Sequence, residues 1–456
     1  MRRLTAIFSV VGIGAIALYF LVTGDSSPSL VHHHNGERWY RIEQNGQHIG
    51  YMHNRVYDQT LTTHINYRPP DAPAVTIRQR LKFAAAAPFA LQTAAYSQRV
   101  GKQYSAVSLL SRADNTEFAD YQATILRNSS ANRATFKGQL KLSDMYSVER
   151  WLSSEPAPGS TLSAPYPDFE QLRVNHRQHQ LLARDPQGYD LIGADADATT
   201  QTRLNKDFVA TKLTMAGRYD VILSDSKNAT PKASAATRRP VAKKILLSQA
   251  LTQRQRLQQL ELQVLGDTTL PSTLITTLGG LSADSVYAEP RSYIGEHIDY
   301  PISHPKIKTL LARFALSGNN LSTAQELVEF TNRQLSYVEN QYAGTVLTAL
   351  EQRRGECTDF ADLYTTLARR LGLPARTVYG LAYDAQDAPG FRFHAWNEVY
   401  VEDRWHSVDP TWNQVVADAT HIPLTDSQYA DVSRQRAGRP LEFRLLKARY
   451  LDDPTP

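Results

Sequence analysis

The sequence predicts an α+β protein in three parts: an N-terminal transmembrane helix, a largely antiparallel β domain and a C-terminal α+β domain. An uncharged run from Leu4 to Val22 follows two arginines and is close to the length of a membrane-spanning helix. From residue 37 onward, short runs of alternating apolar and polar residues are separated by turn residues. Around Cys357, the only cysteine of the chain, apolar residues recur at helical intervals, and a β-hairpin pattern follows.

Residues 4–23 are predicted to be an uncleaved signal anchor, because the apolar run is longer than the core of a usual signal peptide. A signal peptide cleaved near Val22-Thr23-Gly24 is the alternative. In both cases Arg2-Arg3 should stay in the cytoplasm and the rest should be exported. We therefore predict a single-pass membrane protein whose bulk lies on the periplasmic or extracellular side. Residues 24–36 are polar and are predicted to be a linker.

The composition of the chain excludes several classes of partner and cofactor. The net charge of +5 and the pI near 9.0 are too weak to indicate a nucleic-acid partner. A single cysteine excludes a disulfide within the chain and a zinc site built from several cysteines. The chain carries no glycine-rich motif for phosphate or dinucleotide binding. We therefore predict no metal, no cofactor and no nucleic acid.

Residues 37–265 are predicted to form the β domain, whose partner the sequence leaves unknown. Asn45-Gly46 is typical of a two-residue hairpin turn between alternating runs. Ser226–Lys244 has little apolar content and is predicted to be a loop, and Leu257–Leu265 to close the domain as its last strand. Further strands are predicted at Val75–Phe83, Ala94–Val100, Tyr104–Leu110, Tyr121–Leu126, Ala134–Leu140, Leu181–Arg184 and Asp220–Ser224, with a helix at Ser143–Leu152.

Residues 266–300 are predicted to be a connector, residues 301–426 the C-terminal domain and residues 427–456 a surface tail. Helical spacing predicts helices at Lys306–Leu316 and Thr323–Leu335. A short strand is predicted at Asp418–Leu424, where Pro423 would confine it to a sheet edge.

Cys357 lies at the start of a predicted helix. The run Thr358–Arg370 has helical spacing, and Gly372 and Pro374 end it. Unpaired N–H groups and the helix dipole favour an anion on the first turn, so a thiol there has its pKa lowered and the thiolate is the nucleophilic form. A buried structural cysteine is the alternative reading of this position.

A β-hairpin is predicted after this helix. The run from Phe391 to Val401 is rich in aromatic and β-branched residues, Glu402-Asp403 can form the turn, and the return strand runs to Asp409. With a two-residue loop, Val401 pairs with Arg404, and His394 and Asp409 share a face as diagonal neighbours. A carboxylate beside an imidazole can orient it as a general base for a nucleophile.

Four motifs occur in order: Gly-Glu-Cys-x-Asp-Phe-Ala-x-Leu at 355–363, Leu-Gly-Leu-Pro-Ala-Arg at 371–376, His-Ala-Trp-Asn-Glu-Val at 394–399 and Trp-His-Ser-Val-Asp-Pro-Thr at 405–411. This set resembles the transglutaminase-like domain family, which has a papain-type fold. The resemblance covers roughly the last third of the chain. It implies Cys357 as nucleophile, His394 as general base and acid, and Asp409 as the orienting residue.

The resemblance implies acyl transfer on a peptide or a glutamine-type amide through a thioester, ending in hydrolysis or in transfer to an amine. A non-catalytic peptide-binding or scaffold protein of the cell envelope is the alternative. Trp396, Trp405 and Tyr342 are the predicted substrate-binding residues, although hairpin packing is an equally good reading of the two tryptophans. The Cys357 N–H is the predicted oxyanion donor. Candidates for a side-chain oxyanion donor are Tyr337, Asn340, Gln341 and Tyr342.

Overall fold

The computed structural model divides into two compact units, formed by residues 1–125 with 132–237 and by residues 126–131 with 238–456. The described residues are 36–69, 74–101, 103–110, 120–127, 130–194, 199–215, 219–230, 244–285, 288–314, 320–339, 343–386, 388–434 and 440–451. The predicted signal anchor at 4–23 lies outside them, as does the predicted linker up to residue 35. Among the described residues, no helix is long and apolar enough to cross a bilayer.

The predicted fold class, α+β with an N-terminal transmembrane helix, is wrong for the described chain. The structure is mostly β, with 50% strand and 19% helix. The difference has a local cause. Segments that the sequence predicted to be a connector and a tail are strands of a large, mostly antiparallel sheet, so the second unit carries more strand than its helical motifs suggested.

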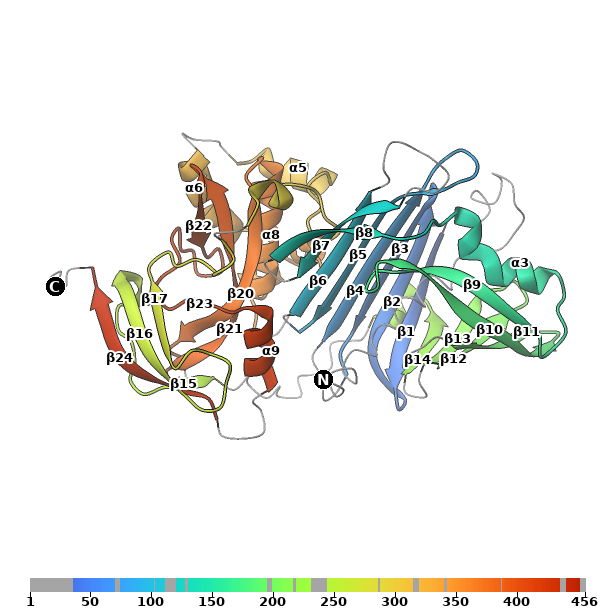
Figure 1. Ribbon diagram of the computed structural model, residues 1–456, viewed down its shortest axis with the longest axis horizontal. Helices are drawn as coiled ribbons and strands as arrows, with labels where there is room; N and C mark the ends of the chain where they lie inside the picture. The colour runs from blue at the N-terminus through green and yellow to red at the C-terminus, as the bar shows by residue number, and fades with distance from the viewer. Residues whose placement is uncertain are drawn as a thin grey trace. The chain divides into compact units, whose positions relative to one another are not determined.

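The first unit is built on a sheet of 14 described strands in the order β8-β7-β6-β5-β4-β3-β2-β1-β14-β13-β12-β11-β10-β9 (Figure 1). The predicted Asn45-Gly46 hairpin is confirmed, because Gln44 pairs with Gln47 and both turn residues have positive φ. The strands are β1 (Gly36–Gln44), β2 (Gln47–Tyr57), β3 (Thr60–Tyr67), β4 (Val75–Phe83), β5 (Leu91–Val100), β6 (Gln103–Leu110), β7 (Tyr121–Arg127), β8 (Ser130–Phe136), β9 (Thr161–Asp168), β10 (Arg173–Asp185), β11 (Gly188–Ala194), β12 (Thr199–Asn205), β13 (Ala210–Met215) and β14 (Tyr219–Ser224).

Alternation along these strands places one set of side chains in the core of the first unit. In β3, for example, Leu61 and Ile65 are buried while their neighbours are partly exposed. A short helical segment, η2 (Leu142–Tyr146) followed by α3 (Ser147–Ser153), adds Tyr146 and Leu152 to the same core. It falls where the sequence predicted a helix. A single turn, α4 (Ser226–Ala229), follows β14.

The second unit has an eight-stranded sheet in the order β17-β16-β24-β15-β21-β20-β23, with β22 paired to β21. Its strands are β15 (Ile245–Leu247), β16 (Leu257–Leu265), β17 (Thr273–Thr277), β20 (Ala375–Asp384), β21 (Gly390–Val401), β22 (Arg404–Val408), β23 (Ile422–Pro423) and β24 (Glu442–Tyr450). β16 was predicted to close the β domain but pairs with β17 and β24 here (Figure 1). β24 was predicted to be a surface tail but lies between β16 and β15. Pro423 lies on the sheet edge, where the sequence placed it.

Helices pack on this sheet around α8 (Cys357–Arg370), which is buried over most of its length. Its apolar residues Phe360, Leu363 and Leu367 share a core with Val399 of β21 and Leu327 of α6. The remaining short elements are η3 (Arg254–Arg256), η5 (Pro290–Tyr293), α5 (Pro305–Leu311), α6 (Asn320–Asn332), β18 (Ser336–Tyr337), α7 (Val346–Gln352), β19 (Arg354–Gly355) and α9 (Asp426–Arg434). The core therefore fixes α8 against the strand that carries His394.

Candidate active site

Cys357 is the first residue of α8, where the sequence predicted it. Glu356 caps the helix, and Asp359 completes the capping box because the Glu356 N–H donates to its Oδ2 at 2.9 Å. Gly355 permits this arrangement: a Cβ there would lie 2.5 Å from the Cβ of Asp359. Only 4% of Cys357 is exposed. The thiol therefore lies on the first turn of a tightly capped helix.

His394 reaches the thiol from β21. The hairpin register is the predicted one, with Val401 opposite Arg404, and both turn residues, Glu402 and Asp403, have positive φ. Asn397, three residues after His394, is fully buried and donates from Nδ2 to the Ala361 carbonyl at 2.9 Å. This bond joins β21 to α8. Because the helix and strand are held together, the imidazole and the thiol form a side-chain hydrogen bond.

Asp409 follows β22 and is fully buried. Its Oδ1 accepts from the N–H groups of Thr411 at 2.8 Å and Trp412 at 3.3 Å. Its Oδ2 accepts from His394 Nε2 at 2.8 Å. Since Nε2 is engaged with Asp409, Nδ1 is the nitrogen left for Cys357. The structure thus brings Cys357, His394 and Asp409 together in the order nucleophile, base and orienting carboxylate.

The pKa values of His394 and Asp409 are set by two opposing effects, burial of each group and its pairing with charged neighbours. Burial alone would lower the pKa of His394, but the charge and hydrogen bond of Asp409, with Cys357 adding to them, raise it above the ordinary value. Burial alone would raise the pKa of Asp409, yet the two histidines around it, His394 and His421, hold it far below its usual range. Asp409 is therefore ionised and His394 is a stronger base than a free imidazole.

Three residues near the triad escaped the sequence analysis. Trp412 stacks on the His394 ring, with centroids 4.1 Å apart. Arg254 lies over the Trp412 ring, with its Cζ 4.4 Å from the ring centroid. Its segment was assigned to the β domain in the sequence analysis. His421 contacts the same carboxylate oxygen of Asp409 as His394 does, with Nε2 3.2 Å from Oδ2. No periodicity or short motif marks any of them, because each lies in a loop or a single helical turn.

Tyr337 lies near enough to Cys357 for the two side chains to interact electrostatically. Burial and the nearby Cys357 raise the pKa of Tyr337, while 41% of the residue stays accessible. Its hydroxyl accepts from Arg392 Nη2 at 3.4 Å, and Arg392 also pairs with Glu339 and Asp384. Tyr337 is thus the one predicted side-chain oxyanion donor that the described residues place near Cys357.

The predicted substrate-binding residues are placed differently. Trp396 is fully buried in the core with Val378 and lies beside His394. Trp405 is also buried and packs edge-on against Tyr293 and Tyr400. These positions support the packing alternative for both rings. Tyr342 lies outside the described residues, together with Asn340 and Gln341.

His394, Asp409 and His421 also form a group whose ligand atoms lie within 4.8 Å of one another, as a metal site would require. The two Nε2 atoms, however, both point at Asp409 Oδ2 and hydrogen-bond to it. Hydrogen bonding accounts for the whole cluster, so we assign no metal to it.

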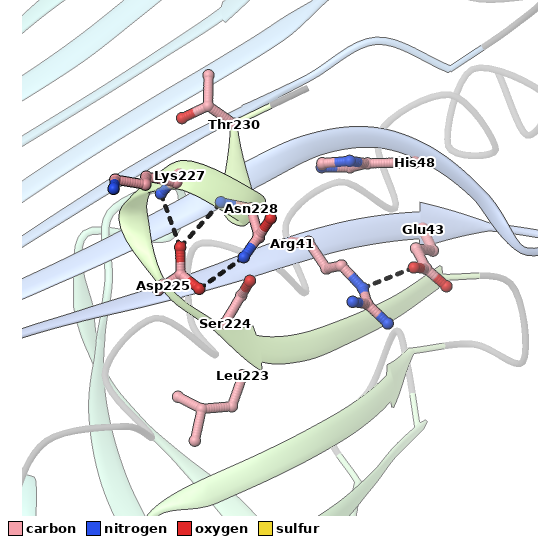
Figure 2. A pocket seen from close by; sticks show the side chains of 9 residues that line it. All are labelled: Arg41, Glu43, His48, Leu223, Ser224, Asp225, Lys227, Asn228 and Thr230. Carbon is pink, nitrogen blue, oxygen red and sulfur yellow. Dashed lines mark hydrogen bonds and ion pairs between the residues drawn. The ribbon is translucent and has the colours of Figure 1, made fainter. Parts of the chain in front are cut away.

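The first unit contains a separate polar hollow of about 800 Å³. Figure 2 shows Arg41 paired with Glu43 on one side and Asp225 accepting from Lys227 and Asn228 on the other. His48 Nε2 faces the carbonyls of Gly50 and Ala229 at 3.0 and 2.9 Å. These side chains interact mainly with one another, and we assign no function to the hollow.

Comparison with known proteins places the site in a family. Residues 308–410 match the transglutaminase-like superfamily. An 81-residue stretch is 36% identical to the kyphoscoliosis peptidase of Mus musculus, covering 17% of this chain and 12% of that protein. A 93-residue stretch is 36% identical to the uncharacterized protein ML0607 of Mycobacterium leprae, covering 19% of this chain and 33% of that protein. This chain thus spans a small part of the curated relatives that it matches.

Among solved structures, one described as a candidate cysteine protease from Cytophaga hutchinsonii is 18% identical. It covers 39% of this chain and 59% of its own length, with a TM-score of 0.26.

Proposed function

From the transglutaminase-like domain that residues 308–410 form, we infer that this protein is a cysteine acyl-transfer enzyme. Its proposed substrates are peptide bonds or glutamine-type carboxamides of a peptide or protein. The single observation that carries the proposal is that His394 binds Asp409 through Nε2 and also forms a side-chain hydrogen bond with Cys357.

The proposed chemistry runs through a thioester. His394 Nδ1 takes the thiol proton, and Cys357 Sγ attacks the carbonyl carbon to form a tetrahedral oxyanion. The oxyanion collapses, the C–N bond breaks, and the imidazolium gives its proton to the leaving amine. Water or a second amine then attacks the thioester carbonyl, releasing the acid or the new amide and returning the proton to Sγ.

Two groups are proposed to stabilise the oxyanion. The Cys357 N–H lies on the first turn of α8, where N–H groups have no partner within the helix. The Tyr337 hydroxyl interacts electrostatically with Cys357. Donors aimed at the developing charge contribute about 3 kcal/mol each in comparable sites. Tyr337→Phe should therefore lower kcat more than it changes KM.

Turnover of a peptide library containing Gln and Lys tests the proposal, with products read by mass spectrometry in the presence and absence of a primary amine. The wild type should release products, and Cys357→Ala and His394→Ala should not. A mass gain from the added amine would identify transfer, and its absence would identify hydrolysis. Equal release by wild type and Cys357→Ala would contradict the enzymatic proposal and leave the non-catalytic peptide-binding role.

Export of the chain, predicted from its N-terminal run, stays a prediction. If it holds, the proposed substrates are peptides or proteins of the cell envelope. A reporter fused after residue 456 that is active only outside the cytoplasm would test it.

A further inference from the structure

His421 lies beside His394, with ring centroids 5.8 Å apart, and both imidazoles contact the Asp409 carboxylate. Asp409 Oδ2 is 3.2 Å from His421 Nε2 and 2.8 Å from His394 Nε2, so one carboxylate oxygen serves two imidazoles. His421 follows the Asp409 loop and directly precedes β23, and only 2% of it is exposed. The chemistry described above does not use this residue.

The contacts of His421 determine its charge. Its Nε2 faces the Asp409 carboxylate, and its Nδ1 faces two oxygens of Asp418, the backbone O at 3.1 Å and Oδ1 at 3.3 Å. All of these oxygens are acceptors. A neutral imidazole carries one N–H and would turn a lone pair toward one carboxylate, so the geometry requires an imidazolium with both nitrogens protonated.

The charged groups around His421 form a line of alternating sign. Asp409 lies on one side, and Asp418 on the other. Beyond Asp418, Arg254 Nε lies 3.8 Å from its Oδ2. Among the described residues, the ring also packs against His394 and against the uncharged rings of Trp396 and Trp412.

We propose that His421 is a positioning residue of the acyl-transfer site, which holds Asp409 on His394 and offsets part of its negative charge. The inference rests on the proposed function. Asp409 is then clamped by four donors, since Thr411 and Trp412 hold its other oxygen. The same contacts set the charge of the ring: although burial opposes it, hydrogen bonds and charges of Asp409 and Asp418 raise the pKa of His421 to about 9.

The proposal predicts opposite effects for the two middle groups of the line, His421 and Asp418. His421→Gln removes a positive charge but keeps an N–H donor, so Asp409 should stabilise the His394 imidazolium more strongly. Asp418→Asn removes a negative charge and keeps one of the two acceptor oxygens, so the imidazolium should be stabilised less. The pKa of His394 should rise in the first variant and fall in the second, each by roughly one unit.

The readout is alkylation of the single thiol by iodoacetate as a function of pH. Iodide leaves as Cys357 Sγ bonds to the methylene carbon, and the anionic reagent favours the protonated imidazole, so the alkaline limb of the profile reports His394. We expect that limb to move to higher pH in His421→Gln and to lower pH in Asp418→Asn. Damage to the fold alone would not give shifts of opposite sign.

Arg254→Gln provides a third measurement, because the Arg254 side chain is 29% exposed and its loss should perturb the core least. It removes a positive charge and should shift the limb upward, by less than His421→Gln. His297→Gln is the matched control: His297 is a buried histidine 3.5 Å from Asp299 in the same unit, outside this line. It should leave the limb in place.

An alkaline limb that stays fixed in the variants that fold, or that moves in one direction for both His421→Gln and Asp418→Asn, would overturn the proposal. Alkylation needs no substrate, so this outcome is separate from that of the proposed function. Opposite shifts without any turnover of the peptide library would contradict only the enzymatic role.

Discussion

The Asp409 carboxylate has two imidazoles on one oxygen and two backbone N–H groups on the other. A buried carboxylate with so many donors is ionised, and each donor restricts its rotation. The direction in which His394 points is therefore set by a carboxylate that is itself held in place. Pre-organisation of this kind is what a general base requires, because the base must lie within hydrogen-bond reach of the proton that it takes.

The charge of His421 makes stability depend on pH. The folded pKa of His421 is about 9, raised from 6.5, so its contribution is complete below pH 6.5 and is lost as pH rises through 9. Linkage puts this contribution on the order of 3 kcal/mol. The free energy of unfolding should therefore differ most between wild type and His421→Gln below pH 6.5, and the difference should shrink by pH 9.5. Urea unfolding at pH 6 and pH 9.5 measures it. A difference that is independent of pH would contradict the charged state of His421.

At low pH, Asp418 makes the free energy of unfolding depend on pH in the opposite direction. Burial would raise the pKa of Asp418, but His421 and Thr420 lower it to about 2 from 3.8. Its contribution is present above pH 3.8 and is lost as pH falls through 2. Asp418→Asn should remove this part of the fall in the free energy of unfolding at low pH and leave the contributions of the other carboxylates unchanged.

At the scale of single residues, the resemblance to the transglutaminase-like family implied the triad, and two kinds of local information agreed with it. Helical spacing placed Cys357 on a first turn, and a two-residue hairpin loop put His394 and Asp409 on one face. His421 and Trp412 could not be predicted in this way. Both lie in an irregular segment after Asp409, and no period relates a residue there to the residues that it meets.

At the scale of elements, the distance between thiol and imidazole depends on how α8 is fixed to β21. Asn397 supplies the polar link, donating to the Ala361 carbonyl and to Thr365 Oγ1, both at 2.9 Å. Asn397→Ala leaves these buried acceptors without their donor, which costs about 1–3 kcal/mol of stability. We also expect slower alkylation of Cys357 at neutral pH. Stability equal to that of the wild type would mean that apolar contacts alone hold the two elements together.

The start of α8 is equally constrained. In Gly355→Ala the new Cβ would lie 2.5 Å from Asp359 Cβ and 2.6 Å from its Oδ2, so the capping carboxylate must move. Loss of a helix cap costs about 1 kcal/mol, and the backbone must also shift. Gly295→Ala is a matched control, since a Cβ there meets nothing within 4 Å. Thermal unfolding should show a lower Tm for Gly355→Ala and an unchanged Tm for Gly295→Ala. Equal Tm values would show that the capping box is not needed.

At the scale of the whole molecule, the last strand among the described residues belongs to the same sheet as β21, which carries His394. β24 lies between β16 and β15, and Phe443 on it is buried against Phe391 of β21, with ring centroids 5.2 Å apart. Phe443→Ala should cost about 3–5 kcal/mol through the lost burial and the cavity left behind. Leu446→Ala on the same strand, where 48% of the side chain is exposed, should cost little. Denaturant unfolding compares them, and equal losses would mean that β24 is dispensable.

The sequence did not predict which strands belong to which sheet. The strand at Leu257–Leu265 was recognised from its alternation, yet alternation shows which face is buried and not which strand is the partner. Its partner, β24, follows it by almost two hundred residues, so no hairpin turn reports the pairing. By contrast, the Asn45-Gly46 and Glu402-Asp403 hairpins were predictable, because a tight turn specifies partner and register together.

The central claim is that His394, oriented by Asp409, activates the Cys357 thiol. The rate of Cys357 alkylation by iodoacetamide against pH, in wild type and in His394→Ala, tests it most directly. The account predicts an apparent thiol pKa well below the ordinary value of about 8.5 in the wild type and a rise toward that value in His394→Ala. An apparent pKa near 8.5 in both proteins would contradict it.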